Sequence, residues 1–243
     1  ELMDMPSGMV RAWFDYWLQE RKTAPMPPAR VVSYEGGDDN GRGWQAFEQW
    51  PPETARVVEL ALSQDGSLAT VPGAPGTQAF SQSHFSGLLW SEDAVVFTSD
   101  RLTTDWVLAG DMEVTLKARF SEADANINAR LFELRDGEER LIEQGWLKLS
   151  HRNSHVHPVP VTPNGEISVR VPLWAVHQRI PAGSQLVLKL SGGSVIDLVS
   201  ADSPVRTEIA TGEEGSTLRL IVLGETESSS GSITLGGSSS VSK

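Results

Sequence analysis

The sequence of 243 residues contains no cysteine. This absence excludes a disulfide-bonded scaffold, a thiolate zinc site and a cysteine nucleophile. The chain also lacks an apolar run of about 18 residues, the length that a membrane-spanning helix requires. Basic residues are scarce, because 20 Lys and Arg stand against 32 Asp and Glu, and the formal net charge is -12. Since this charge repels phosphates and anionic lipid headgroups, we expect neither nucleic acid nor a membrane as a partner.

The residues that are present are typical of a soluble globular protein, with 39% hydrophobic and 21% charged residues. The length suffices for one large β domain or two small ones. The opening ELMDMPSGMV lacks the basic stretch and apolar core of a signal peptide, which favours the cytoplasm over secretion without deciding the compartment. Because a helical pattern begins almost at once, we interpret the chain as a fragment of a longer protein.

The clearest structural signal is a strictly alternating stretch, 111–120, in the middle of the chain. A period of two over this length predicts a strand with one face on a core and the other in water. Gly110 stands directly before it, where the chain can bend into the strand. Phe97 and Trp106 are nearby apolar groups that a core between two sheets would absorb. The apolar face consists of Met112, Val114, Leu116, Ala118 and Phe120.

Many other short segments have strand-like patterns, and an Asp136-Gly137 pair between two of them is a hairpin signal. Many short strands with almost no helix predict an all-β fold, a β-sandwich of the jelly-roll type. The Ser/Gly-rich end, 225–243, cannot bury enough apolar surface to order itself and is predicted to be a disordered, flexible tail. The expected strands are 30–34, 56–62, 126–134, 141–149, 156–161, 166–173, 185–190 and 217–223.

An aromatic helix is predicted near the N-terminus, over 9–21. It carries Trp13, Phe14 and Trp17, more aromatic surface than a lone helix leaves exposed. We therefore expect it to be a docking helix that packs on the β domain or on a partner. A Pro-rich linker, 23–29, ends it, so we divide the chain into a helix with linker (1–25), a β-sandwich (26–224) and a tail (225–243).

A long segment rich in Gly, Pro, Ser and Gln, 63–93, is predicted to be a loop, and loops of this length are usually functional or mobile. Its apolar residues would either cover the core of their own domain or meet another domain or ligand. The residues that we predict for a substrate pocket or domain interface are Phe80, His84, Phe85, Leu89 and Trp90.

No catalytic motif is present, since Gly-x-Ser-x-Gly occurs nowhere in the sequence. His155 and His157 would share one face of a strand, with His151 nearby, a spacing compatible with a divalent metal. A polar strand face or an edge loop explains these histidines as well, and we expect no metal and no cofactor. His84 and His177 are isolated and are expected to be ordinary surface or hydrogen-bonded residues.

Two further ligand patterns have simpler explanations. Asp38-Asp39-Asn40 opens like a calcium loop, but Arg42 and Gln49 then stand where oxygen ligands are needed, so we expect a turn. Trp44, Trp50 or Trp90 would suit stacking on a sugar ring, although Trp is also a normal core residue of sandwiches. Sugar binding through these tryptophans therefore remains an alternative.

Several segments in order resemble one known family, and together they span nearly the whole chain up to about residue 223. The aromatic helix resembles the segment that ends the catalytic domain of X-Pro dipeptidyl-peptidases and CocE/NonD hydrolases. The spacing of Gly36, Trp44 and Trp50-Pro51-Pro52 is similar to the start of their C-terminal domain. Three further motifs resemble elements of that domain: Phe97–Leu102 with Leu108-Ala109-Gly110, Gly145–Arg152 and Ile180–Leu186.

The resemblance implies a serine hydrolase in which an α/β-hydrolase domain carries the catalytic Ser, Asp and His. It implies that this chain is the jelly roll with a galactose-binding-like fold that follows that domain and packs beside its active site. All three catalytic residues would then precede Glu1, and no residue of this chain would be catalytic. The partners would be the upstream α/β-hydrolase domain of the same protein and, through it, an X-Pro peptide or acyl ester substrate.

Two alternatives to this function stay open at this point. One is a free-standing β-sandwich that binds carbohydrate or another ligand. The other is an assembly domain for which the aromatic helix is the docking element.

Overall fold

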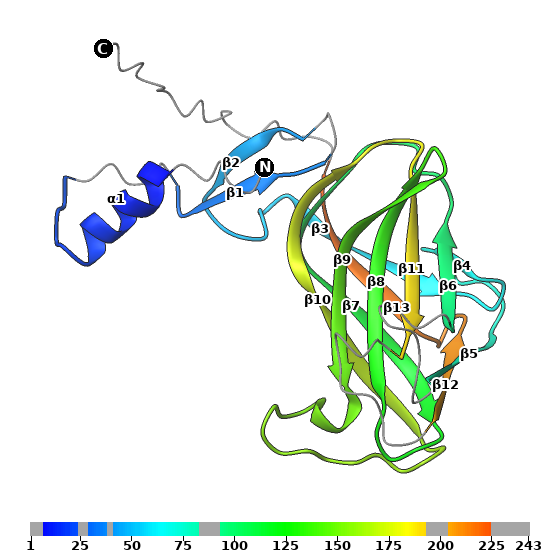
Figure 1. The fold of residues 1–243 in the computed structure, drawn as a ribbon. Coiled ribbons are helices and arrows are strands. Elements are labelled where there is room, and N and C mark those ends of the chain that lie inside the picture. The colour runs from blue at the N-terminus through cyan, green and yellow to red at the C-terminus, as the bar shows by residue number, and fades with distance from the viewer. Residues whose placement is uncertain (1–6, 24–28, 38–40, 83–92, 193–203, 225–243) are drawn as a thin grey trace.

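A computed structural model of the chain describes residues 7–23, 29–37, 41–82, 93–192 and 204–224. One helix is followed by strands almost throughout (Figure 1). The elements are α1 (Ser7–Trp17), β1 (Val31–Glu35), β2 (Gly43–Phe47), β3 (Ala55–Leu62), β4 (Ser67–Ala69), β5 (Gly76–Gln82), β6 (Ala94–Ser99), β7 (Trp106–Phe120), β8 (Asn126–Arg135), β9 (Glu138–Lys148), the short 3-10 helix η2 (Leu149–His151), β10 (Glu166–Ile180), β11 (Gln185–Ser191), β12 (Val205–Thr211) and β13 (Thr217–Leu223). Within these ranges, no helix combines the length and apolarity needed to cross a bilayer.

Eleven strands form one hydrogen-bonded sheet that folds over on itself. Their order is β5-β12-β7-β13-β3-β4-β6-β11-β8-β9, and β10 pairs with β7. The short strand β4 joins the two layers, because it pairs antiparallel with β3 and parallel with β6. Figure 1 shows β9, β8 and β11 in front of β7 and β13. The fold is the predicted all-β sandwich, and the tail predicted for 225–243 lies outside the described residues.

The core between the layers is built from the alternating faces of the strands, as the pattern of β7 predicts. All five apolar residues of its inner face are buried, whereas Glu113, Thr115 and Lys117 of the other face are partly exposed. Phe80, Phe97 and Phe120 are among the largest fully buried side chains. Because burial of apolar area supplies most of the folding free energy, this face of β7 is the centre of the domain.

Gly110 was expected to stand before the strand, but it lies inside β7, which begins at Trp106. Gly110 has φ +142°, a conformation that side chains with a Cβ rarely adopt. A Cβ there would lie 3.0 Å from both Ile221 and Pro51. The pairings of β7 with β10 and with β13 both shift register at this level of the strand. The glycine therefore accommodates the register shifts with which one long strand pairs with β10 and with β13.

Two expectations about irregular segments were wrong. The segment 63–93 is not one loop, because it contains the short β4 and the longer β5, which pairs with β12. The predicted strand 156–161 is a loop instead. Pro158 and Pro160 have no N–H to donate to a strand ladder. The N–H of Val159 donates to the Ser150 carbonyl at 2.7 Å, and the N–H of Val161 donates to the Ala123 carbonyl at 2.9 Å.

The helix is shorter than predicted, and some strands are longer. α1 ends at Trp17 rather than at residue 21. β10 continues past Leu173 to Ile180, beyond a bulge, and it is this extension that reaches the β1–β2 hairpin. No strand was predicted for β2, β6 or β12.

Replacing Gly110 by Ala is expected to lower the free energy of unfolding by about 2–4 kcal/mol, because strain at this φ adds to crowding. Urea denaturation measures the change. Gly137→Ala is the matched control: Gly137 also has a positive φ, of +83°, but nothing lies within 4 Å of an added Cβ. The control should lose about 1 kcal/mol. Equal losses in the two variants would contradict this account of Gly110.

Candidate functional site

The β1–β2 hairpin is a separate two-stranded sheet that is attached to the end of strand β10. Its backbone attachment is a parallel bridge between Gly36 and Gln178. The Gly36 N–H donates to the His177 carbonyl, and the Arg179 N–H donates to the Gly36 carbonyl, both at 2.9 Å. Since these residues end β1 and lie on the extension of β10, the hairpin is fixed at one short segment of the sandwich.

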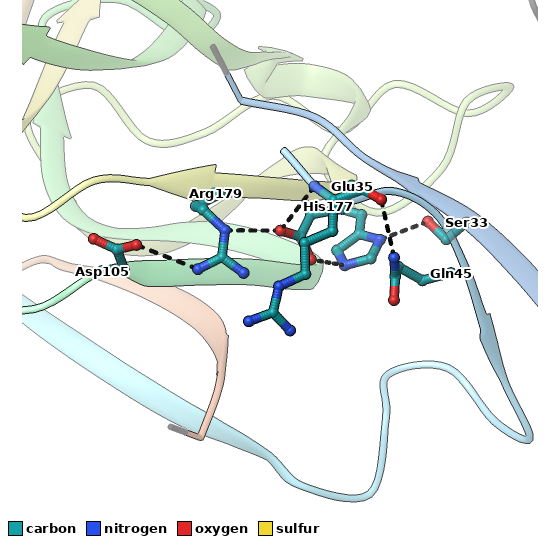
Figure 2. A network of polar contacts seen from close by, with 7 residues as sticks. Ser33, Glu35, Gln45, Asp105, His177 and Arg179 are labelled. Carbon is teal, nitrogen blue, oxygen red and sulfur yellow. Dashed lines mark hydrogen bonds and ion pairs between the residues drawn. The ribbon is translucent and has the colours of Figure 1, made fainter. Parts of the chain in front are cut away.

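A group of charged side chains reinforces this attachment (Figure 2). Glu35 is only 3% exposed, and its Oε1 accepts a 2.8 Å hydrogen bond from Arg179 Nε. Arg179 Nη1 also donates to Asp105 Oδ2 at 3.4 Å, and Asp105 Oδ1 accepts the Ala182 N–H at 2.9 Å. The arginine thus joins the hairpin, the segment before β7 and the β10–β11 turn. We refer to Ser33, Glu35, Asp105, His177 and Arg179 as the hairpin cluster.

His177 is the most strongly perturbed member of the hairpin cluster. Its Nδ1 lies 3.1 Å from Ser33 Oγ, and the rings of Phe47 and Trp50 pack against it with centroid distances of 5.4 and 5.3 Å. Burial of the imidazole lowers the pKa of His177 from 6.5 to about 4, a shift that Glu35 opposes and Arg179 assists. The ring is therefore neutral at physiological pH.

Ser33, His177 and Glu35 have the residue types of a catalytic triad without its geometry. His177 Nε2 lies 3.7 Å from Glu35 Oε2, too far for a hydrogen bond, and has no hydrogen-bond partner among the described residues. The other Glu35 oxygen is held by Arg179. A histidine with a pKa near 4 is a weak base, and its side chain is 2% exposed. This group is a structural contact.

A second set of Ser, His and carboxylate also lacks the order that catalysis needs. Ser150 stands in the middle: its Oγ donates to Asp124 Oδ2 at 2.8 Å and lies 3.0 Å from His151 Nδ1. The Ser150 N–H donates to the same carboxylate at 2.8 Å. Because the carboxylate holds the serine rather than the histidine, it closes the turn after β9 instead of orienting a general base.

The motifs that carry the family resemblance have structural roles, and two of them meet near the hairpin cluster. Ser99 Oγ accepts the Leu186 N–H at 2.8 Å, and Arg101 donates to the Gly183 carbonyl at 2.7 Å. Gly145 belongs to the third motif. It lets β9 approach β10 closely, because a Cβ there would lie 2.0 Å from the Pro172 carbonyl oxygen. The motif residues therefore make contacts that hold the strands of the sandwich together.

A cavity of about 580 Å³ lies beside the hairpin cluster, between the hairpin and the end of the sandwich. Glu35, Asp105 and Arg179 line one side of it. The sequence analysis did not single out these three residues; their only signal was proximity to the motif segments and to Gly36. His177 was expected to be an ordinary hydrogen-bonded or surface residue, and it is buried and hydrogen-bonded.

The predicted docking helix presents aromatic side chains to solvent. Trp13, Phe14 and Trp17 of α1 are 46%, 46% and 55% exposed. Trp13 and Phe14 pack edge to face, with ring centroids 5.2 Å apart. They do not belong to the buried core cluster of the sandwich.

The residues predicted for a pocket or interface on the 63–93 segment are not brought together as a described site. Phe80 lies on β5 and is 1% exposed in the sandwich core, so it is a core residue rather than part of a surface loop. Alternation along β5 turns its side chain inward. His84, Phe85, Leu89 and Trp90 lie outside the described residues, and their role stays a prediction.

The alternative ligand sites have ordinary surroundings. His155 and His157 are exposed in a loop rather than on a strand face, and in the described part of the chain no group of three potential ligand residues gathers to hold a metal. Trp44 packs edge to face on Tyr34, and Trp50 packs on Phe47. These two tryptophans consolidate the hairpin and its neighbouring segment.

The low pKa of His177 predicts an acid-dependent loss of stability. Because the folded-state pKa is depressed, the unfolded state binds a proton below pH 6.5 that the folded state does not bind until about pH 4. Stability should therefore fall as the pH is lowered through this window, by up to about 3 kcal/mol. His177→Gln should remove this part of the pH dependence, measured by urea unfolding at several pH values. His157→Gln, at an exposed site, should keep it; identical pH profiles for wild type and His177→Gln would contradict the assignment.

Three solved structures have a similar fold. An aminopeptidase from the marine sediment archaeon Thaumarchaeota archaeon has a TM-score of 0.72 and 16% identity, over 88% of this chain and 44% of its own. An α-amino acid ester hydrolase has a TM-score of 0.72 and 18% identity, over 89% and 44%. A CocE/NonD family hydrolase from Staphylococcus aureus has a TM-score of 0.70 and 16% identity, over 88% and 45%. The chain thus spans less than half the length of these proteins.

Sequence comparison gives the family directly. No curated protein sequence matches the chain significantly. The sequence profile of a domain family, described as the X-Pro dipeptidyl-peptidase C-terminal non-catalytic domain, matches residues 22–230. Because this match covers most of the chain and runs through every strand of the sandwich, the chain belongs to the family of X-Pro dipeptidyl-peptidase C-terminal non-catalytic domains.

Proposed function

We propose that this chain is the C-terminal sandwich of a serine hydrolase and packs beside the active site of an α/β-hydrolase domain that precedes it in the same polypeptide. The observation that carries the proposal is the family match over 22–230, whose description names a non-catalytic domain. The three hydrolases of similar fold are more than twice as long as the region they share with this chain. Their additional length is sufficient for a catalytic domain.

The proposed reaction of the whole protein is hydrolysis of an X-Pro peptide or an acyl ester by a serine nucleophile. The names of the similar proteins, an aminopeptidase, an α-amino acid ester hydrolase and a CocE/NonD hydrolase, favour acyl transfer to water. The sandwich itself would position the catalytic domain and shape its substrate pocket. We retain His84, Phe85, Leu89 and Trp90 as proposed contacts of that pocket or of the domain interface.

In this proposal, residues 1–25 are the end of the catalytic domain with its linker, 26–224 the sandwich, and 225–243 a flexible tail. The aromatic face of α1 supports the division, since side chains as large as Trp13, Phe14 and Trp17 are about half exposed. Apolar surface of this kind on one short helix marks an interaction site. Burying it against the preceding domain would provide the main apolar contact between the two.

The isolated chain is expected to hydrolyse neither Xaa-Pro-p-nitroanilides nor p-nitrophenyl esters, because the hairpin cluster and the Ser150 group lack triad geometry. The protein with its preceding domain should hydrolyse at least one of these substrates. Turnover is followed by release of the chromophore. Activity of the isolated chain that survives purification controls and disappears in Ser33→Ala would refute the proposal.

The docking role of α1 predicts a second result. In the full protein, replacing Trp13 and Trp17 together by Ala should lower the thermal midpoint of the catalytic domain by several degrees, because the contact between the domains is lost. The circular dichroism of the sandwich should not change. Trp174→Ala is the matched control, since Trp174 is 70% exposed on β10. A similar effect of both variants, or none, would argue against docking through α1.

A further inference from the structure

The cavity beside the hairpin cluster has no occupant assigned by the proposed function. Its volume of about 580 Å³ falls in the range of ligand pockets. Its walls come from the end of β1, from β2, from the segment between β2 and β3, from the start of β7 with the segment before it, and from the ends of β10 and β13. A space of this size admits a side chain together with part of the backbone that carries it. Glu35, Gln45, Phe47, Glu48, Glu53 and Arg179 are among the residues that line it.

The cavity has a fixed polar base, and its lining mixes polar with apolar side chains. Glu35 and Gln45 are 3% and 2% exposed, so two polar side chains are buried at its base. Gln45 Nε2 donates to the Arg42 carbonyl at 3.1 Å, and Glu35 is held by Arg179. Phe47 and Val107 contribute apolar surface. The hydrogen bonds and the ion pair keep this floor in one arrangement before any occupant arrives.

The charge of the cavity is negative. Four carboxylates and two guanidinium groups line it, which gives a formal charge of -2. The charge of Arg179 is already shared between Glu35 and Asp105. Glu48 and Glu53, in contrast, are exposed, and in the described ranges neither has an ion-pair partner. Two carboxylates at the rim are therefore available to a cation, against the one exposed guanidinium of Arg42, while the buried charges are satisfied.

A polar base, a few apolar side chains in the lining and a negative rim together fit a long side chain with a positive end. Lys and Arg pack their methylene groups along apolar surface and direct the charged group to carboxylates. Arg in addition matches carboxylate oxygens with paired N–H donors. A small metal ion would make no use of apolar side chains such as Phe47 and Val107, and an anion would be repelled by the rim.

The position of the cavity indicates where the side chain comes from. α1 and the hairpin are the first elements of the described chain, and Figure 1 shows them on the same side of the sandwich. The similar hydrolases contain more than half of their length outside the shared region. A segment that docks on α1 from the preceding domain therefore reaches the hairpin side first.

We propose that this cavity is a docking socket that receives an arginine or lysine side chain of the preceding catalytic domain, with Glu48 and Glu53 as its charge partners. The inference rests on the proposed function, because the occupant belongs to that domain. The hairpin cluster holds the floor of the socket, and the apolar face of α1 provides the adjoining contact. The pair of interactions sets the orientation of the sandwich.

The first test uses the 243-residue chain and a small probe. Nα-acetyl-arginine amide should shift the backbone amide NMR signals of Ala46 and Phe47 saturably, with a dissociation constant on the order of millimolar, and Nα-acetyl-glutamine amide should not. Glu48→Gln with Glu53→Gln should weaken binding about three- to tenfold. Glu122→Gln with Glu213→Gln, at exposed sites elsewhere, should leave it unchanged. No saturable shift, or equal binding by the Glu48/Glu53 variant, would overturn the proposal.

The second test separates this inference from the proposed function. In the full protein, hydrogen exchange of β2 should be slower than in the isolated chain, and Glu48→Gln with Glu53→Gln should remove that protection. Unchanged protection in a variant that still hydrolyses its substrate would overturn the socket and leave the proposed function standing. A full protein without hydrolase activity would instead refute the proposed function. Dimerisation of the isolated chain that the double variant abolishes would assign the socket to a second copy and also overturn the proposal.

Discussion

The arrangement of the N-terminal side of this domain depends on one largely buried ion pair, Glu35 with Arg179. The hairpin shares no continuous strand pairing with the sandwich, only a single bridge at Gly36. Removing one partner of a buried pair leaves an uncompensated charge and typically costs about 3–5 kcal/mol. The pair therefore fixes the hairpin on β10. The floor of the cavity and the direction from which the chain enters the sandwich follow from that attachment.

Two groups with the residue types of a catalytic triad lack its geometry. The chemistry of a triad requires a histidine that bonds to both a serine and a carboxylate. In the hairpin cluster, the carboxylate of Glu35 accepts its hydrogen bond from Arg179, and aromatic rings pack against the imidazole of His177. In the second group, the carboxylate of Asp124 accepts a hydrogen bond from Ser150 rather than from His151. In both places the polar groups stabilise a junction of the fold, in agreement with a family whose domains are described as non-catalytic.

Much of the fold could be predicted from the sequence because period-two alternation reports directly on burial. The alternation of 111–120 predicted β7 and its inner face, whereas Gly110 was expected before the strand and lies inside it. The segment 63–93 was harder, since its Gly, Pro and Ser content concealed β5, whose ladder with β12 is a long-range contact. In 156–161 the apolar pattern predicted a strand, but Pro158 and Pro160 cannot donate to a strand ladder. Local composition does not show which distant segment will pair with a given strand, such as β12 with β5.

The candidate site was less accessible to sequence reasoning, for a physical reason. Glu35, Asp105 and Arg179 are separated by about 70 residues or more along the chain and meet only through the fold. Single charged residues carry no periodic signal, and burial alone distinguishes them from surface charges. The aromatic helix could be identified because Trp13, Phe14 and Trp17 lie within one or two turns and need no tertiary information.

The central claim is that this domain contributes structure and docking while the chemistry belongs to another part of the protein. A fluorophosphonate probe forms a covalent bond only with an activated serine, so it tests this claim directly. After labelling of the full hydrolase, peptide mass spectrometry should place the modified serine outside residues 1–243. A label on Ser33 or Ser150 would contradict the account.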